Sequence, residues 1–292
     1  AIGAAFAGNV AVTTTSGPGL ALKAEAIGLA LMTELPIVII DVQRGGPSTC
    51  LPTKTEQSDL LQAMYGRNGE SPVIVIAAKS PADCFESSFE AVKLATEHMT
   101  PVILLTDGYV ANGSEPWEIK HMSEMPEIHP NDLKTPREDW LPYKRNPETL
   151  AREWVKPGTP GYEHRVGGLE KEDGTGDVNQ SPDNHEVMVK LRAEKIKRVE
   201  NNIPEAVVEG SQEGDLLVIG WGGTYGSLFT SVTHLHEAGY DIGLLHFKHL
   251  NPMPKNTAEI LKRYKRFIVC ELNMGQLHTV INGRFPEYDY MK

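Results

Sequence analysis

The sequence contains little cysteine and no long apolar run. Its three cysteines, Cys50, Cys84 and Cys270, stand far apart in 292 residues. This spacing fits neither a disulfide framework nor a set of zinc or iron–sulfur ligands, so we expect a reducing, cytoplasmic location and no metal site. No apolar run approaches the roughly 20 residues of a membrane span. The first residues also lack the basic and apolar segments of a signal peptide, so we expect no membrane association.

An excess of basic residues is also missing. The chain has 28 Lys and Arg against 39 Asp and Glu, a formal net charge of −11. Binding to nucleic acid needs clustered cations against the phosphates, so this class of function is excluded. Hydrophobic residues make up 40% of the chain and charged residues 23%, which is typical of a globular protein with a sizeable core. The length is sufficient for two domains.

Strand and helix patterns alternate along most of the chain. Apolar runs at residues 37–40, 73–77 and 102–106 predict buried strands, and helices are predicted over residues 20–32 and from Ser80 onwards. In the second of these helices, Phe85 and Phe89 are expected to pack against the sheet; in the first, Leu22 is expected to lie on the helical face with Ala26 and Leu29. A second unit of the same kind begins at residue 215. The fold class is therefore α/β with a doubly wound parallel sheet.

The segment from about 118 to 210 differs in composition, because it is rich in proline and turn-forming residues. Irregular segments of this length are usually functional loops or disordered. The aromatic residues Trp140, Tyr143, Trp154 and Tyr162 predict instead an ordered arm on a protein surface. One helix is predicted to start at Ser181.

A loop with one guanidinium follows the strand at residues 37–40. It contains Arg44, two glycines, and the hydroxyls of Ser48, Thr49 and Thr53. Ligands of open α/β sheets bind at the carboxyl ends of strands, and a guanidinium with hydroxyls around it suits a small carboxylate or phosphate. The alternative is an arginine that only stabilises a turn. The loop alone does not separate the two.

Two glycine turns also follow strands. The turn of Thr15, Ser16, Gly17, Pro18 and Gly19 could direct backbone N–H groups at an anion or ring, but a plain strand-to-helix turn is the favoured explanation. The turn at residues 220–226 lacks the spacing of a dinucleotide fingerprint and is interpreted as structural. Histidines at 234, 236, 246 and 249 lack the acidic and thiol neighbours of a metal site.

Together these segments resemble the α subunit of 2-oxoacid:ferredoxin oxidoreductases, and most closely the 2-oxoglutarate type (2-oxoglutarate synthase). The runs that carry the resemblance are TTTSGPGLALKAEAIGLA, ELPIVIIDVQRGGPST, LPTKTEQSDLLQAMYGRNGE, TPVILLTDGYVANGSEPW, HRVGGLEKEDGTG, GDLLVIGWGGTYGS and CELNMGQL. They are long and cover nearly the whole chain.

The resemblance implies a thiamine-diphosphate-binding fold. Residues 1–118 would form the pyrimidine-binding domain, 119–210 an extended arm with one helix, and 211–292 a domain similar to the transketolase C-terminal domain. Arg44, with Thr49 and Thr53, would bind the 2-oxoacid substrate, and the cofactor side of the pocket would be lined by Thr15, Ser16, Gly17 and Gly19. The β subunit would hold the diphosphate, its Mg²⁺ and the iron–sulfur cluster. Coenzyme A would accept the acyl group and ferredoxin the electrons.

Two departures from the family pattern bear on this implication. The family's glutamate for the aminopyrimidine and its Tyr-Pro-Ile-Thr-Pro loop would lie upstream of Ala1, so we expect a truncated chain with no catalytic residue of its own. Cys50 stands where the family usually has glycine. If that position has a positive φ, the side chain would cost about 1 kcal/mol and narrow the pocket.

Two other functions remain open at this stage. The chain could be a non-catalytic assembly module of thiamine-enzyme fold, because the family's glutamate is missing from it. It could also belong to a transketolase-like thiamine enzyme without a redox step. The substrate could be 2-oxoglutarate, pyruvate or a branched 2-oxoacid.

Overall fold

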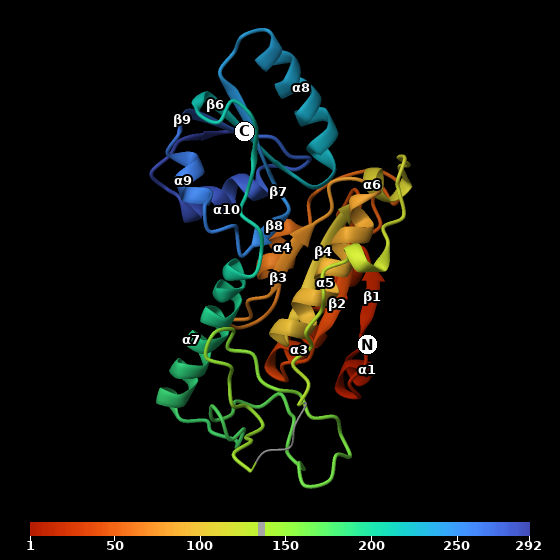
Figure 1. The fold of residues 1–292 in the computed structure, drawn as a ribbon, viewed down its shortest axis with the longest axis vertical. Helices are drawn as coiled ribbons and strands as arrows, with labels where there is room; N and C mark the ends of the chain where they lie inside the picture. Colours follow the sequence, from red (N-terminus) through yellow and green to blue (C-terminus); the bar gives the residue numbers. More distant parts are fainter. Residues whose placement is uncertain (134–137) are drawn as a thin grey trace.

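The computed structural model describes residues 1–133 and 138–292, in which two five-stranded sheets are connected by a long arm (Figure 1). The first sheet has the order β1-β2-β4-β3-β8 and the second the order β10-β9-β6-β7-β5. The strands are β1 (Val12–Thr15), β2 (Ile37–Gln43), β3 (Ile74–Ala77), β4 (Pro101–Asp107), β5 (Val208–Gly210), β6 (Gly214–Trp221), β7 (Ile242–Phe247), β8 (His249–Asn251), β9 (Tyr264–Val269) and β10 (Tyr290–Met291).

Helices cover the sheets in the sequence order predicted for a doubly wound α/β fold. They are α1 (Ile2–Phe6), α2 (Gly17–Leu22), α3 (Ala24–Met32), α4 (Leu60–Tyr65), α5 (Asp83–His98), α6 (Gly108–Asn112), α7 (Pro182–Arg198), α8 (Tyr225–Glu237), α9 (Thr257–Leu261) and α10 (Gln276–Arg284), with 3-10 turns η1 (Met122–Glu124), η2 (Val199–Asn201) and η3 (Gly222–Thr224). The α/β prediction is confirmed, with antiparallel pairing only where β5 meets β7 and β8 meets β3 among the described strand pairs.

The central strands of the first sheet are buried on both faces. Val38 packs in the cluster on the α5 side, with Leu94 and Ala91, whereas Ile39 packs in the cluster that contains Leu20 and Leu60. A strand covered on both sides must be apolar at every position, which is why residues 37–40 read as a continuous apolar run.

β8 joins the two units. It follows β7 of the second sheet directly, yet it pairs with β3 of the first. The two sheets are thus linked by strand pairing as well as by the arm. The domain boundaries at 118 and 210 stay predictions.

Two predicted helix faces are wrong. The prediction of a single helix over residues 20–32 fails, because the chain turns at Lys23 between α2 and α3; Leu22 is 89% exposed, and the buried residues of α3 are Ile27, Ala30 and Leu31. Phe85 on α5 is 45% exposed and packs against Trp117, with 5.0 Å between ring centroids.

The small size of several buried residues of α5 explains why Phe85 faces outward. The buried residues of α5 are Ser87, Ala91, Leu94, Ala95 and His98. Small side chains let the helix approach the sheet closely, so the bulky phenylalanine turns outward to meet an aromatic residue that lies far away in sequence.

The arm is ordered through much of its length and ends in α7, as predicted. Tyr143 and Trp154 are buried, and Ser181 caps α7 by accepting a hydrogen bond from the backbone N–H of Asn184 at 3.3 Å. Pro136 lies outside the described residues. In Figure 1 the arm packs at the end of the first sheet where α3 ends.

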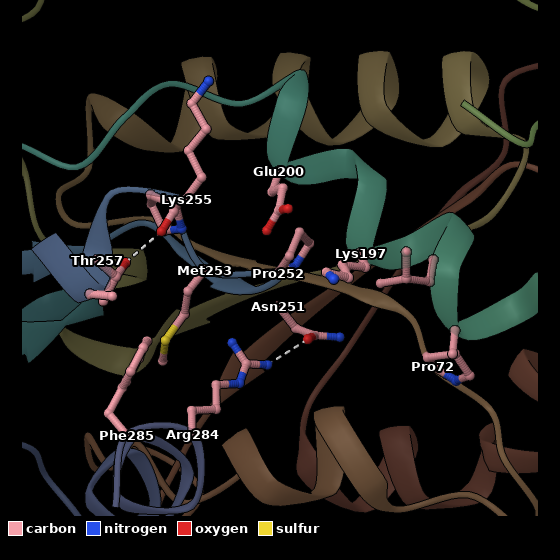
Figure 2. Close-up of a pocket in the computed structure, with 14 residues that line it drawn as sticks. Pro72, Lys197, Glu200, Asn251, Pro252, Met253, Lys255, Thr257, Arg284 and Phe285 are labelled. Carbon is pink, nitrogen blue, oxygen red and sulfur yellow. Dashed lines mark hydrogen bonds between the residues drawn. The ribbon is translucent and has the colours of Figure 1, made fainter. Parts of the chain in front are cut away.

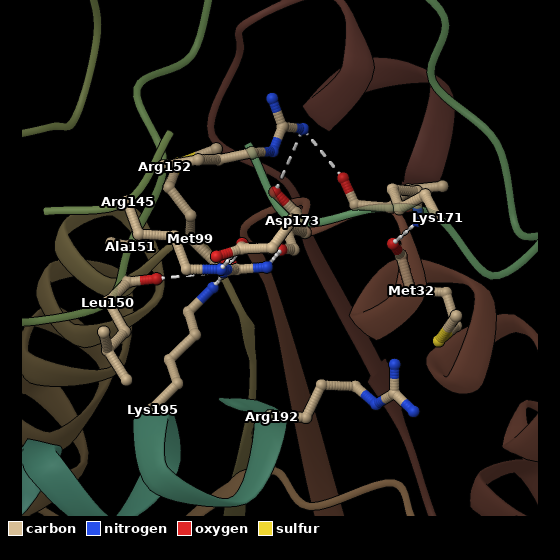
Figure 3. Close-up of polar contacts among 12 residues, drawn as sticks. Met32, Met99, Arg145, Leu150, Ala151, Arg152, Lys171, Asp173, Arg192 and Lys195 are labelled. Atoms are coloured by element: carbon tan, nitrogen blue, oxygen red, sulfur yellow. Dashed lines mark hydrogen bonds and ion pairs between the residues drawn. The ribbon is translucent and has the colours of Figure 1, made fainter. Parts of the chain in front are cut away.

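Buried charges fix the arm to that end of the sheet (Figure 3). Glu34, which follows α3, accepts hydrogen bonds from Arg145 at 2.7 and 3.1 Å and from Lys195 at 2.7 Å. Burial alone would raise the pKa of Glu34, but Lys195 and Arg145 outweigh it and hold the pKa well below its usual range. Arg145 is also paired with Asp173 at 2.7 Å.

The same cluster caps the C-terminus of α3. Arg152 donates to the carbonyl of Thr33 and Lys171 to the carbonyl of Met32, both at 2.8 Å. The last carbonyls of a helix have no intrahelical partner and carry partial negative charge, so cations at this position are doubly favourable.

Candidate functional site

The predicted site residues lie at the carboxyl edge of the first sheet. β1 ends at Thr15 and pairs in register with Asp41 of β2, so the turn after β1 and the loop after β2 start side by side. Thr15 and Ser16 are half-buried at this edge. The structure therefore places the two predicted groups, the Thr15–Gly19 turn and the Arg44 loop, on one edge.

The two glycines of the turn are required by internal contacts. A Cβ on Gly17 would lie 2.5 Å from Oδ1 of Asp59, and one on Gly19 would overlap Oγ1 of Thr15. The α2 helix that begins here has only six residues. Close packing explains both glycines, so they are not by themselves an indication of a ligand.

Two buried carboxyl groups stand beside this turn, and the sequence analysis missed both. Asp41 is completely buried, and neither of its carboxylate oxygens has a hydrogen-bond partner in the part of the chain that the structure describes. Burial and the neighbouring carboxylate of Asp59 raise the pKa of Asp41. Burial likewise raises the pKa of Asp59. Two like charges in low dielectric do not both ionise easily, so the neighbouring carboxylate acts on Asp41 in the same direction as burial does. An acid at the end of an otherwise apolar strand was the available signal.

Arg44 is the unpaired cation of the site. It is half-buried directly after β2, its Nε is buried without a hydrogen-bond partner, and it forms no hydrogen bond or ion pair within residues 1–133 and 138–292. The alternative role of stabilising a turn would require contacts from the guanidinium to nearby carbonyls or acids. These contacts are missing in the described chain, so the geometry favours a guanidinium that is available to a ligand.

The loop after Arg44 is closed by its own backbone. Gly45 donates to the carbonyl of Lys54 at 2.9 Å and accepts from the N–H of Leu51 at 3.0 Å. Glu56 then accepts from the N–H of Gly46 at 3.0 Å and from the hydroxyl of Ser58 at 2.6 Å. The bond from Ser58, followed by that from Gly46, lowers the pKa of Glu56.

The remaining predicted residues of this loop are exposed at its tip. Thr49, Cys50 and Thr53 all face outward, and Cys50 is a free thiol. The strain considered for Cys50 is not there, because the residue with positive φ in this loop is Ser48, at 55°. The loop brings Thr49 and Thr53 into the same segment as Arg44 without a hydrogen bond between them.

The described residues contain neither a metal-ligand cluster nor a membrane-spanning helix. In the described residues, no three His, Cys, Asp or Glu side chains are grouped as metal ligands would be. Within the same residues, no helix has the length and apolar character needed to cross a bilayer.

The sequence matches two protein-family profiles that together cover most of the chain. Residues 1–182 match "Pyruvate flavodoxin/ferredoxin oxidoreductase, thiamine diP-bdg", and residues 214–289 match "Pyruvate:ferredoxin oxidoreductase core domain II". The chain belongs to the pyruvate flavodoxin/ferredoxin oxidoreductase family. The resemblance found in the sequence is thereby confirmed.

Relatives within this oxidoreductase family carry 2-oxoglutarate in their names. The chain is 52% identical to the 2-oxoglutarate oxidoreductase subunit KorA of Mycobacterium tuberculosis, over 98% of its own length and 43% of that protein. It is 33% identical to the 2-oxoglutarate synthase subunit KorA of Methanothermobacter thermautotrophicus, over 94% of this chain and 73% of the relative. The chain thus spans less than half of the mycobacterial relative.

A solved structure of the family has the same fold. It is the 2-oxoglutarate:ferredoxin oxidoreductase from Magnetococcus marinus with 2-oxoglutarate, coenzyme A and succinyl-CoA bound. The TM-score is 0.88 at 36% identity, and the match covers 97% of this chain and 49% of that one. A split-gene transketolase shares the fold with a TM-score of 0.54 at 11% identity.

Proposed function

We propose that this chain is part of the α subunit of a cytoplasmic 2-oxoacid:ferredoxin oxidoreductase that oxidatively decarboxylates 2-oxoglutarate to its acyl-CoA. The observation that carries the proposal is Arg44, a guanidinium without a partner among residues 1–133 and 138–292. It lies at the carboxyl edge of a domain that matches the thiamine-diphosphate-binding family profile. The names of the relatives support 2-oxoglutarate over pyruvate or a branched 2-oxoacid.

Each predicted residue then has a definite role. Arg44 would bind a carboxylate of the oxoacid with two parallel hydrogen bonds. Thr49 and Thr53, at the tip of the closed loop, would add hydroxyl contacts when the loop lies over the substrate. The arginine approaches from a rigid strand, which fixes the substrate's orientation.

The described residues fit only part of a thiamine diphosphate site. Thr15 and Ser16 offer half-buried hydroxyls at the carboxyl edge, in the turn with Gly17 and Gly19, and would line the ring side. No group of three potential metal ligands is present among the described residues, so the proposed β subunit would supply the Mg²⁺ and diphosphate contacts. Bound thiamine diphosphate would supply the carbanion and the electron sink that decarboxylation needs. The iron–sulfur cluster would likewise belong to the β subunit and pass electrons to ferredoxin.

The test is an anaerobic assay of the full-length protein co-purified with its β subunit. We expect reduction of ferredoxin that requires both 2-oxoglutarate and coenzyme A, with pyruvate a poorer substrate. Oxoacid consumption without acceptor reduction would favour the non-redox transketolase-like function, and binding of the β subunit without turnover would favour an assembly module. Either result would refute the proposal.

A further inference from the structure

The glycine-rich turn at residues 220–226 of the second unit contacts Gln57, a few residues after the loop that contains Arg44. Gln57, which follows that loop and is completely buried, donates from Nε2 to the carbonyl of Trp221 at 2.8 Å. A Cβ on Gly222 would lie 2.6 Å from this nitrogen, and Gly222 has a φ of 57°. Gly222 is therefore a glycine for two reasons: its backbone conformation and the approach of Gln57.

Gln57 is also held from a second direction. Its N–H donates to the carbonyl of Leu272 at 3.0 Å, and its Oε1 accepts from the N–H of Leu272 at 3.1 Å. Its carbonyl accepts from Nδ2 of Asn273 at 2.7 Å. Every polar group of Gln57, in main chain and side chain, is thus satisfied by the second unit.

A second residue of the first unit enters the same turn. Asp107, at the end of β4, caps α6 with Oδ1 and accepts from the N–H of Gly223 with Oδ2 at 3.1 Å. A Cβ on Gly223 would overlap this carboxylate. Neighbouring glycines thus accommodate Gln57 and Asp107, both from the carboxyl edge of the first sheet.

The bonds that close the Arg44 loop lie immediately before Gln57 in sequence. Lys54 closes the loop through Gly45, and Glu56 through Gly46. Displacement of Gln57 would move both anchors and, with them, the position of Arg44 and the two threonines. A misplacement of about 1 Å in a substrate-positioning group costs up to about 100-fold in rate.

We propose that Gln57 is a positioning residue, and that the second unit sets the affinity for the oxoacid through the pocket that Gly222 and Gly223 provide for Gln57 and Asp107. This inference rests on the proposed function. In this proposal the glycine-rich turn is neither a dinucleotide site nor a plain strand-to-helix turn, because it positions residues of the first unit. The second unit would control substrate binding without touching the substrate.

Two alanine variants in one turn provide the test. Gly222→Ala removes the space for Gln57, whereas Gly226→Ala is a matched control because nothing lies within 4 Å of a Cβ there. In the complete enzyme with its β subunit, we expect Gly222→Ala to raise the KM for 2-oxoglutarate by about tenfold or more with retained thiamine content and a smaller change in kcat. Gly226→Ala should leave the KM unchanged. An unchanged KM in a folded Gly222→Ala enzyme would overturn the proposal.

If Gly222→Ala does not fold, Gln57→Glu tests the positioning role of Gln57 instead. The substitution keeps the shape of the side chain but places an oxygen against the carbonyl of Trp221. The same rise in KM is expected, and an unchanged KM would refute the role of Gln57.

Hydrogen exchange provides a readout that does not depend on turnover. The amides of Gly45, Gly46 and Leu51 should exchange faster in Gly222→Ala, or in Gln57→Glu if that variant is used, than in Gly226→Ala. Equal protection of these amides in the two variants would contradict the proposed role of Gln57. This result can be read even if the wild-type enzyme has no oxoacid-dependent activity. Such a lack of activity would refute the proposed function separately.

Discussion

The two ends of strand β2 use arginine in opposite ways. Before the strand, Arg145 reaches Glu34 and Asp173, and its donors are engaged by carboxylates and by the carbonyl of Leu150. After the strand, Arg44 has no such partner in the described chain. A paired, buried arginine contributes to the folded structure, whereas an unpaired one at a sheet edge is available for a ligand. The absence of such contacts is the ground on which Arg44 is proposed to bind a ligand.

The largest effect on stability is expected at the start of β2, where Arg145 is paired with Glu34. Glu34→Ala would leave Arg145 and Lys195 buried without their shared carboxylate, and breaking a buried ion pair in this way costs about 3–5 kcal/mol. The melting temperature of the purified protein should fall steeply. Lys262→Ala is the control, because its pair with Glu259 is exposed and screened by solvent, so its loss should change the melting temperature little. Equal melting temperatures for the two variants would show that the Glu34 cluster does not hold the arm.

Two glycines, one in the Thr15–Gly19 turn of the proposed cofactor side and one in α3, allow a second comparison. Gly17→Ala would place a methyl group on the Asp59 carboxylate, and this overpacking should cost about 1–3 kcal/mol and lower thiamine diphosphate content in the complete enzyme. Gly28→Ala in α3 has nothing within 4 Å, so it should stabilise by about 0.5–1 kcal/mol through helix propensity. Denaturant unfolding measures both, and a neutral Gly17→Ala would remove the packing explanation.

A pH-dependent effect on stability is expected at Asp41. Its pKa in the folded protein lies above that in the unfolded chain, so the stability it contributes is full below the unfolded value, near 3.8, and is lost as pH rises towards about 8. Asn cannot ionise. Asp41→Asn should therefore gain stability over wild type as the pH rises from 5 to 8, by about 1.4 kcal/mol for each pH unit that lies between the unfolded and the folded pKa.

Thermal unfolding of the two proteins at both pH values measures this gain. A stability difference that does not change with pH would show that Asp41 is ionised throughout.

Features decided by local sequence were predictable. Strand β2 is predictable because its residues 37–40 are apolar and pack on both faces of the sheet, and α7 because Ser181 and Pro182 form a start signal. The loop with Arg44 is predicted as a site because a cation, glycines and hydroxyls follow that strand directly, and its role stays a prediction. These signals lie within a few residues of one another.

Features that depend on distant partners were not predictable. Glu34 and Arg145 are 111 residues apart, and Phe85 faces outward because Trp117 is there to meet it. Gln57 gives no local signal, since its importance comes from carbonyls and amides of residues 221 and 272. The pairing of β8 with β3 depends in the same way on a contact between distant segments.

The same substitution at the two ends of β2 tests the central claim most directly. In the complete enzyme, Arg44→Lys should raise the KM for 2-oxoglutarate and lower kcat/KM by about tenfold to 100-fold, because an ammonium cannot form the paired hydrogen bonds worth about 1.5–3 kcal/mol. Its melting temperature and thiamine content should be unchanged. Arg145→Lys should do the reverse, with a lower melting temperature and an unchanged KM. A folded, cofactor-loaded Arg44→Lys enzyme with the KM of the wild type would contradict the assignment of Arg44 as the group that binds the oxoacid.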